Sequence, residues 1–132
     1  MHQLLKIYFG YDTFRPLQEE IISHILAKKE ALVIMSTGGG KSLCYQLPAL
    51  KFKGLTLVIS PLIALMKDQV DALNANGIAA EFINSTLSYE AIDEIKFRLK
   101  KEQIKILYIA PERLAMPDFL EFLRTLKVDL IA

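Results

Sequence analysis

The sequence predicts an α/β domain with a mainly parallel sheet, and three observations support this fold class. Five short apolar runs end at intervals of 23 to 26 residues, which leaves room for one helix and tight turns between consecutive strands. The runs are almost continuous in Val, Ile and Leu, a pattern typical of strands buried on both faces of a parallel sheet. Helix-start and helix-stop residues occur in the segments between them. We therefore expect three layers, with helices on both faces of the sheet.

The expected strands are, in chain order, residues 31–35, 55–60, 79–84, 104–110 and 128–132. Pro16 and Pro61 fit first-turn positions of the helices that follow them. Ser60 and Ser88 fit N-cap positions, and Gly77 fits the exit of the helix before it. No repeat or linker interrupts the chain, so residues 1–132 are expected to form one domain that is truncated at its fifth strand.

Composition and charge narrow the class of protein. With 52% hydrophobic and 23% charged residues, the chain is not intrinsically disordered. Its net charge of +1 lacks the excess of Lys and Arg that many nucleic-acid-binding proteins have. Nucleic-acid binding through backbone amides and a few side chains is still possible. Cys44 is the only cysteine, and no apolar run reaches the ~18 residues of a membrane span. We therefore expect a cytoplasmic protein without disulfides or membrane contact.

A glycine-rich loop follows the first expected strand and opens a helix, with the sequence Ser36-Thr37-Gly38-Gly39-Gly40-Lys41-Ser42. The glycines let the backbone approach phosphate groups closely, Lys41 can reach the β- and γ-phosphates, and the Ser42 hydroxyl can ligate Mg²⁺. The strict pattern G-x-x-x-x-G-K-[ST] is not met, because Met35 occupies its first glycine position. An ordinary glycine-rich turn followed by a surface lysine is the alternative. The strand–loop–helix setting favours phosphate binding.

A second feature lies upstream, around Gln18. The helix that begins there and the strand that returns to the loop are both about 17 Å long, so Gln18 should lie level with the glycine-rich loop. A glutamine amide can donate to adenine N7 and accept from N6 at once. Tyr11 can stack on the base, and Arg15 can add a charge beside it. The alternative is a helix N-terminal turn with exposed polar residues.

Polar residues follow the later strands at the edge where parallel strands end together. They are Ser60-Pro61, Asn84-Ser85-Thr86 and Pro111-Glu112-Arg113. In open α/β sheets, ligands bind at the carboxyl ends of the strands. The sequence therefore predicts that these segments line one ligand-binding edge together with the glycine-rich loop.

Four segments resemble RecQ-type DNA helicases of superfamily 2. FGYDTFRPLQEEII is similar to motif 0 of that family, MSTGGGKSLCYQLPAL to motif I, SPLIALMKDQVDAL to motif Ia and YIAPERL to motif Ic. The motifs follow the family's order and spacing from Phe9 to Ala132. They are much more specific to this family than a generic phosphate loop is. Ser36 departs from the pattern, since the family usually has proline there. The resemblance implies a P-loop NTPase fold of the RecA-like type.

The resemblance also implies cofactors and roles for the nucleotide site. ATP and Mg²⁺ would be bound, with Tyr11, Arg15 and Gln18 recognising adenine. Residues 37–42 would hold the phosphates, with Lys41 and Ser42 acting in catalysis and Ser42 at the metal. The activity implied is 3′→5′ translocation along single-stranded DNA and unwinding of duplex DNA in recombination and repair, in the cytoplasm or on the nucleoid.

The segments after the second to fourth strands would line the track for single-stranded and partly duplex DNA. Free N–H groups at the helix start near Ser60 and Pro61 can bind a phosphate. The hydroxyls of Ser85 and Thr86 and the guanidinium of Arg113 are further phosphate contacts. Helix capping by Ser60 and Ser88, and an ordinary surface or ion-pair arginine at position 113, are the alternatives.

The family's Asp-Glu-Ala-His box, which follows the last strand of this segment, does not occur in the 132 residues. Asp129 precedes the last apolar stretch and so lies toward the wrong end of the strand to be that acid. Asp93 and Glu94 lie within an expected helix and indicate a solvated face. The second RecA-like domain, which supplies arginine fingers in the family, is also absent. We therefore expect a part of a longer helicase that binds a nucleotide without turning it over.

Two other functions stay open on sequence alone. One is a different P-loop protein, such as a nucleotide kinase or a GTPase, although neither a kinase lid nor a guanine-reading N-K-x-D motif is visible. The other is a non-catalytic nucleotide-binding module.

Cys44 lies where a helix dipole can lower its pKa, but its apolar neighbours indicate a packed core thiol. The basic run at 96–101 favours a dipole interaction at a helix end over DNA contact.

Overall fold

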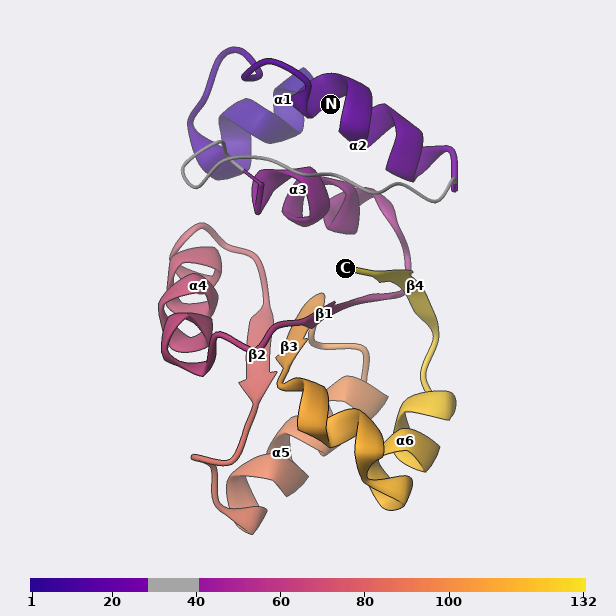
Figure 1. Ribbon diagram of the computed structural model, residues 1–132. Helices are drawn as coiled ribbons and strands as arrows, with labels where there is room; N and C mark the ends of the chain where they lie inside the picture. Colours follow the sequence, from indigo (N-terminus) through magenta and orange to yellow (C-terminus); the bar gives the residue numbers. More distant parts are fainter. Residues whose placement is uncertain (29–40) are drawn as a thin grey trace. The chain divides into compact units, whose positions relative to one another are not determined.

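The computed structural model describes residues 1–28 and 41–132 and divides into two compact units, Met1–Lys51 and Phe52–Ala132 (Figure 1). The expected strand at 31–35 lies outside the described residues. So do Thr37, Gly38, Gly39 and Gly40 of the expected phosphate loop.

The first unit is helical in its described part. Its elements are α1 (His2–Leu4), a π-helical turn η1 (Leu5–Phe9), α2 (Gln18–Leu26) and α3 (Leu43–Lys51). Leu5, Ile22, Leu43 and Leu47 form its buried apolar cluster. These residues come from η1, α2 and α3, so burial of apolar side chains holds the helices together.

The start of α2 differs from the expectation. Pro16 was expected in the first turn, but α2 begins at Gln18 and its N-cap is Leu17, with φ of 71°. A left-handed residue between Pro16 and Gln18 turns the chain sharply, so Pro16 lies before the helix and not in it. A leucine in this backbone region is uncommon and costs about 1–2 kcal/mol.

The second unit contains an all-parallel sheet of four strands. The strands are β1 (Leu55–Ile59), β2 (Ala80–Ile83), β3 (Ile106–Ile109) and β4 (Val128–Ile131), and their order in the sheet is β2-β3-β1-β4. The four later strands that the sequence predicts are therefore confirmed, and so is the α/β class with a parallel sheet. The spacing of the apolar runs along the chain predicts the strands but not their order in the sheet. Each connecting helix can lead to an adjacent position in the sheet or skip one or more positions.

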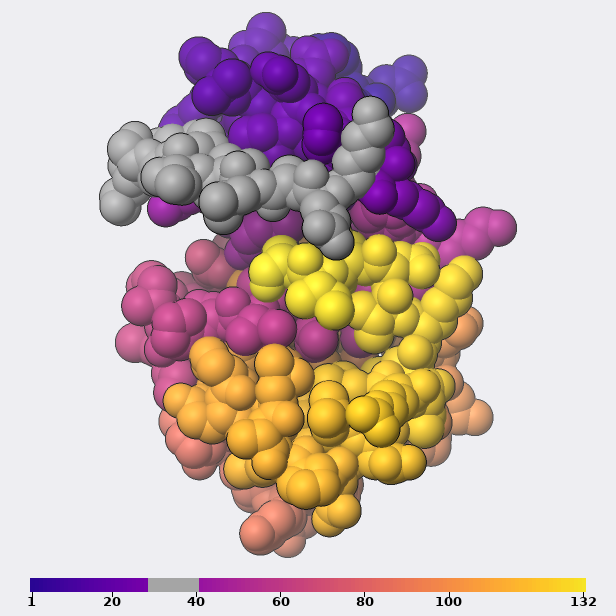
Figure 2. All heavy atoms as spheres, turned by 45° about the vertical axis from the view of Figure 1, so that its right-hand side comes forward, coloured from indigo at the N-terminus to yellow at the C-terminus, as the bar shows by residue number. Residues whose placement is uncertain are grey.

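The connecting helices lie on both faces of this sheet. They are α4 (Ile63–Ala75), α5 (Tyr89–Lys100), the short 3₁₀ helix η2 (Pro111–Ala115) and α6 (Pro117–Arg124). With this strand order, right-handed crossovers place α4 on one face and α5 and α6 on the other, as Figure 1 shows. Figure 2 shows the atoms of α6 and β4, in yellow tones, on one face of this unit.

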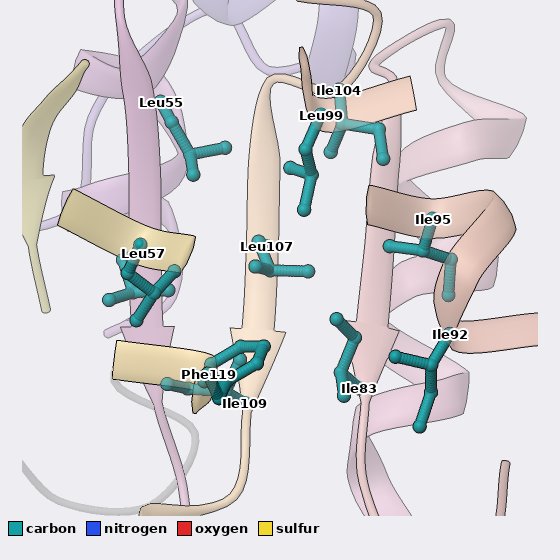
Figure 3. Close-up of a cluster of buried hydrophobic side chains, with 11 residues drawn as sticks. Leu55, Leu57, Ile83, Ile92, Ile95, Leu99, Ile104, Leu107, Ile109 and Phe119 are labelled. Carbon is teal, nitrogen blue, oxygen red and sulfur yellow. The ribbon is translucent and has the colours of Figure 1, made fainter. Parts of the chain in front are cut away.

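Alternate residues of the strands point toward α5 and α6 and form the larger core. Leu57, Leu107 and Ile83 from three neighbouring strands meet Ile92, Ile95 and Leu99 of α5 and Phe119 of α6 (Figure 3). All are less than a tenth exposed. This packing fixes the register of the strands, because a strand that slipped by one residue would turn its own core side chain to the opposite face.

The helix ends in this unit agree with the sequence-based prediction at two positions and differ from it at two others. The Ser88 hydroxyl accepts the N–H of Ala91 at 3.2 Å, which confirms it as the N-cap of α5. Gly77, with φ of 84°, follows α4 as expected, and the left-handed region is open to glycine without strain. By contrast, α4 begins at Ile63 after Leu62 as N-cap. Ser60 and Pro61 therefore precede the helix, because the chain first turns at Ser60.

The amino ends of β1 and β4 are joined by a close contact around Gly54. The Gly54 N–H donates to the Asp129 carboxylate at 2.7 Å, and the strand pairing shifts by one residue between Leu55 and Thr56. A methyl group on Gly54 would lie 2.6 Å from the Lys127 carbonyl oxygen. The Asp129 carboxylate thus holds the start of the sheet together, at the edge away from the expected ligand site.

Candidate nucleotide and nucleic-acid site

Lys41 and Ser42 lie at the start of α3. The Ser42 carbonyl accepts the N–H of Gln46 at 2.9 Å, the first i to i+4 bond of the helix, and the Lys41 carbonyl accepts the N–H of Cys44 at 3.1 Å. The Lys41 side chain is exposed and Ser42 is half-buried. A hydroxyl and an ammonium group at a helix N-terminus suit a phosphate with its Mg²⁺ ion, because the helix end adds N–H donors and positive potential. Ser42 is the described residue that fits as a metal ligand.

Gln18 is only 3% exposed, although it begins a surface helix. Its Oε1 accepts the backbone N–H of Arg15 at 2.8 Å, so the side chain reaches back over the turn that precedes α2. The geometry brings Arg15 and Gln18 together, whereas the alternative of an exposed polar turn does not hold for Gln18. Tyr11 is 57% exposed.

Cys44 is buried at the start of α3, as the apolar neighbours predict. It is 6% exposed, and burial raises the pKa of its thiol. The expectation of a packed core thiol is confirmed.

We expect Cys44 to react slowly with iodoacetamide at neutral pH in the folded chain. A raised pKa lowers the thiolate fraction at that pH, and burial restricts access, so alkylation should be at least about tenfold slower than in the urea-unfolded chain. Mass spectrometry of timed samples measures the two rates. Equal rates would contradict the burial of this thiol.

The carboxyl edge of the parallel sheet brings together residues from three segments. The Ser60 N–H donates to the Ile109 carbonyl at 3.0 Å, so the segment after β1 lies beside the end of β3. Arg113 Nη2 donates to the Asn84 carbonyl oxygen at 3.3 Å, which joins the segment after β3 to the segment after β2. The grouping of Ser60, Asn84 and Arg113 at one edge agrees with the parallel arrangement that the sequence predicts.

The N–H groups of Ser60 and Leu62, expected to be free for a phosphate, are already used. Proline has no N–H, and the N–H of Ser60 continues the sheet ladder to Ile109. The next N–H, of Leu62, donates to the Ser60 hydroxyl oxygen at 3.2 Å. This local turn explains the error, since it uses the backbone donors that a phosphate would need.

Asn84 is the member of this edge to which sequence reasoning gave no individual role. It is 2% exposed, and its Oδ1 accepts from both the N–H and the hydroxyl of Thr86, at 2.9 and 2.5 Å. The Asn-x-Thr spacing directly after a strand is the signal that could have found it, because asparagine side chains bond to the backbone two residues on.

The acidic side chains that the sequence offers on α5 are solvated. Asp93 and Glu94 are exposed on α5, as expected. Within residues 1–28 and 41–132, no group of three or more His, Cys, Asp or Glu side chains is arranged to hold a metal ion. In the same ranges, no helix combines the length and the apolarity needed to span a bilayer.

A cavity of about 340 Å³ lies at the opposite, amino-terminal edge of the sheet, lined in part by Lys53, Lys100, Lys105 and Lys127. Lys105 donates to the Phe52 carbonyl, and Lys100 donates to the Thr125 hydroxyl at 2.5 Å. Desolvation lowers the pKa of Lys105. Lys100 also sits at the carboxyl end of α5, where a cation favours the helix dipole. These contacts give Lys100 and Lys105 structural roles.

Comparison with known proteins places the chain in a family. The DEAD/DEAH box helicase family matches residues 15–130. The ATP-dependent DNA helicases RecQ of Haemophilus influenzae and Bacillus subtilis are 53% and 52% identical to this chain over 98% of its length, covering 21% and 22% of their own. The ATP-dependent DNA helicase Q1 of Mus musculus is 46% identical over 85% of this chain and 18% of its own length.

The chain thus spans about a fifth of the length of the curated relatives it matches. The matched range contains Gln18, Lys41, Ser42 and the polar edge of the sheet. The resemblance to RecQ helicases that the motifs indicate is confirmed, and the chain belongs to the DEAD/DEAH box helicase family.

Proposed function

We propose that this chain is the ATP-binding part of an ATP-dependent 3′→5′ DNA helicase of the RecQ type, which acts on DNA inside the cell in recombination and repair. The family match over residues 15–130 carries this proposal. The start of α3 supports it, because Lys41 and Ser42 occupy a helix N-terminus with the side chains that a nucleotide phosphate and Mg²⁺ need. The grouped polar edge of the sheet supports a DNA track.

The residues of the chain divide into two tasks in this proposal. Lys41, Ser42 and residues 37–40 hold the phosphates of ATP, and Ser42 also ligates Mg²⁺. Bound Mg²⁺ would neutralise charge on the phosphates. Tyr11, Arg15 and Gln18 recognise adenine. A second RecA-like domain completes the ATP site and the DNA track.

The polar edge of the sheet takes the DNA in this proposal. Phosphate groups of the strand contact the segments after β2 and β3, which include Ser85, Thr86 and Arg113, and the hydroxyl of Ser60 after β1, because the backbone N–H groups at Ser60 and Leu62 are already used. Binding by a few such contacts suits a chain with a net charge of +1, and it neutralises few phosphates. We therefore infer weak binding of single-stranded DNA with a shallow salt dependence.

Adenine selectivity tests the nucleotide part of the proposal. If Gln18 donates to N7 and accepts from N6, ADP should bind about 1–3 kcal/mol more tightly than GDP, because guanine presents an acceptor at O6. Gln18→Ala should remove most of this difference. Isothermal titration of both nucleotides into the wild-type chain and the variant measures it.

The ratio of the two dissociation constants separates base reading from a loss of stability, which weakens both nucleotides alike. Gln3→Ala, at an exposed glutamine of the same unit, is the matched control and should keep the preference. Equal affinities for ADP and GDP in the wild-type chain would overturn the role of Gln18. A clear preference for GDP would favour the GTPase alternative.

A further inference from the structure

Asn84 connects several segments at the carboxyl edge of the sheet. It follows β2 directly, and its Oδ1 accepts both hydrogen bonds from Thr86. Its backbone carbonyl accepts from Arg113 Nη2 at 3.3 Å and from the Leu87 N–H at 3.3 Å. Its Nδ2 donates to the Met66 sulfur on α4 at 3.8 Å. The side-chain amide of this buried residue therefore fixes the turn before α5, and its backbone carbonyl holds the guanidinium that follows β3.

This turn decides which neighbouring groups can bind a phosphate. A phosphate oxygen only accepts hydrogen bonds, so its partner must have a donor to offer. Both donors of Thr86, its N–H and its hydroxyl, are used by Asn84. Ser85 is exposed, and neither its N–H nor its hydroxyl bonds to another described residue. Ser85 therefore has two donors to offer, whereas Thr86 has none.

Arg113 supplies the positive charge on the same edge. It is half-buried, and its contacts among the described residues are the Asn84 carbonyl and the Met116 sulfur, at 3.7 Å. None of the ion pairs among the described residues includes it, so the expected alternative of an ordinary ion pair does not hold there. A guanidinium has five N–H donors, so several stay available beside the two in use.

We propose that Ser85 and Arg113 contact one phosphate of the bound single strand, that Asn84 is the residue that positions both, and that Thr86 serves the turn and not the DNA. This rests on the DNA binding proposed above and revises the equal roles that the sequence suggests for Ser85 and Thr86. Asn84 bonds to Arg113 directly and precedes Ser85 in the chain. The two donors are thus set by the same buried residue.

Binding of a fluorescein-labelled oligo(dT) to the 132-residue chain, followed by anisotropy in a low-salt series, tests the assignment. Ser85→Ala should weaken binding about five- to tenfold and leave the salt slope unchanged, because it removes a neutral donor to a charged group. Arg113→Gln should weaken binding and reduce the slope by about 0.7, the value for one phosphate of a single strand. Thr86→Val, which keeps the side-chain shape, should lower the melting temperature but bind within about twofold of wild type.

Asn84→Ala separates positioning from simple stability. Measured well below its melting temperature, its effect on the dissociation constant should be smaller when Arg113→Gln is already present than in the wild type, since the part that acts through the guanidinium is then already lost. A purely structural role would leave the two effects additive. If Asn84→Ala does not fold, the comparison of Ser85→Ala with Thr86→Val decides the question.

The outcomes separate this inference from the function on which it rests. Thr86→Val weakening binding as much as Ser85→Ala, or an unchanged affinity in Ser85→Ala, would overturn the assignment while DNA binding by the wild type stands. No binding of oligo(dT) by the wild type at low salt would instead overturn the DNA part of the proposed function, and with it this inference. Titration with ADP reports on the nucleotide part independently.

Discussion

Lys41→Ala is expected to abolish the binding of ADP and ATP to this chain. Lys41 is the one lysine in the segment 36–42 and is exposed just before α3. A hydrogen bond to a charged group contributes about 1.5–3 kcal/mol, and about 2.8 kcal/mol is already a hundredfold in affinity. Titration with a fluorescent nucleotide analogue in the presence of Mg²⁺ measures the loss.

Lys51→Ala provides the matched control for this prediction. Lys51 is an exposed lysine at the other end of α3, so its replacement removes the same charge from the same helix. We expect nearly unchanged nucleotide affinity in Lys51→Ala. Equal, small losses in the two variants would mean that the lysine acts only through net charge, which would contradict a phosphate contact by Lys41.

Gly54→Ala is expected to lower the free energy of unfolding by about 2–4 kcal/mol. The added Cβ would lie 2.6 Å from the Lys127 carbonyl oxygen and 2.8 Å from the Asp129 carboxylate. Lys127 contributes backbone there, and Asp129 is held by the Gly54 N–H itself, so neither can move aside without separating β1 from β4. Urea unfolding followed by circular dichroism measures the change.

Gly77→Ala serves as the comparison, because the cause of its cost is different. Gly77 has φ of 84°, and no atom lies within 4 Å of a Cβ added there, so the cost is the left-handed backbone alone, about 1–2 kcal/mol. We expect the larger loss for Gly54→Ala. A midpoint for Gly54→Ala equal to that of the wild type would show that β1 and β4 do not approach each other as described.

Local sequence patterns account for the elements of the second unit. The apolar runs at 55–60, 79–84, 104–110 and 128–132 each became a strand of a parallel sheet, because runs that are apolar on both faces can be buried only between two layers of helices. The cap at Ser88 and the exit at Gly77 were predictable for the same reason. Each depends on the chemistry of a single residue beside a helix end.

The errors arose where neighbouring backbone groups compete for the same hydrogen bonds. The segment at Ser60 and Pro61 looked like a helix start with free N–H groups, but the Ser60 N–H joins the sheet ladder and the Leu62 N–H bonds to the Ser60 hydroxyl. Pro16 looked like a first-turn residue, but the left-handed Leu17 delays α2 to Gln18. Residue preferences alone cannot decide such competitions.

The sequence by itself determined the class of fold, the family and the candidate nucleotide residues, because motifs and apolar periods are local. Only the tertiary structure decided the strand order, the burial of Gln18 and the contacts that span the sheet. Arg113 lies 29 residues from Asn84, and Asp129 lies 75 residues from Gly54. Such pairs form only after the crossovers have brought their strands together, and no local pattern encodes which distant backbone group a side chain will meet.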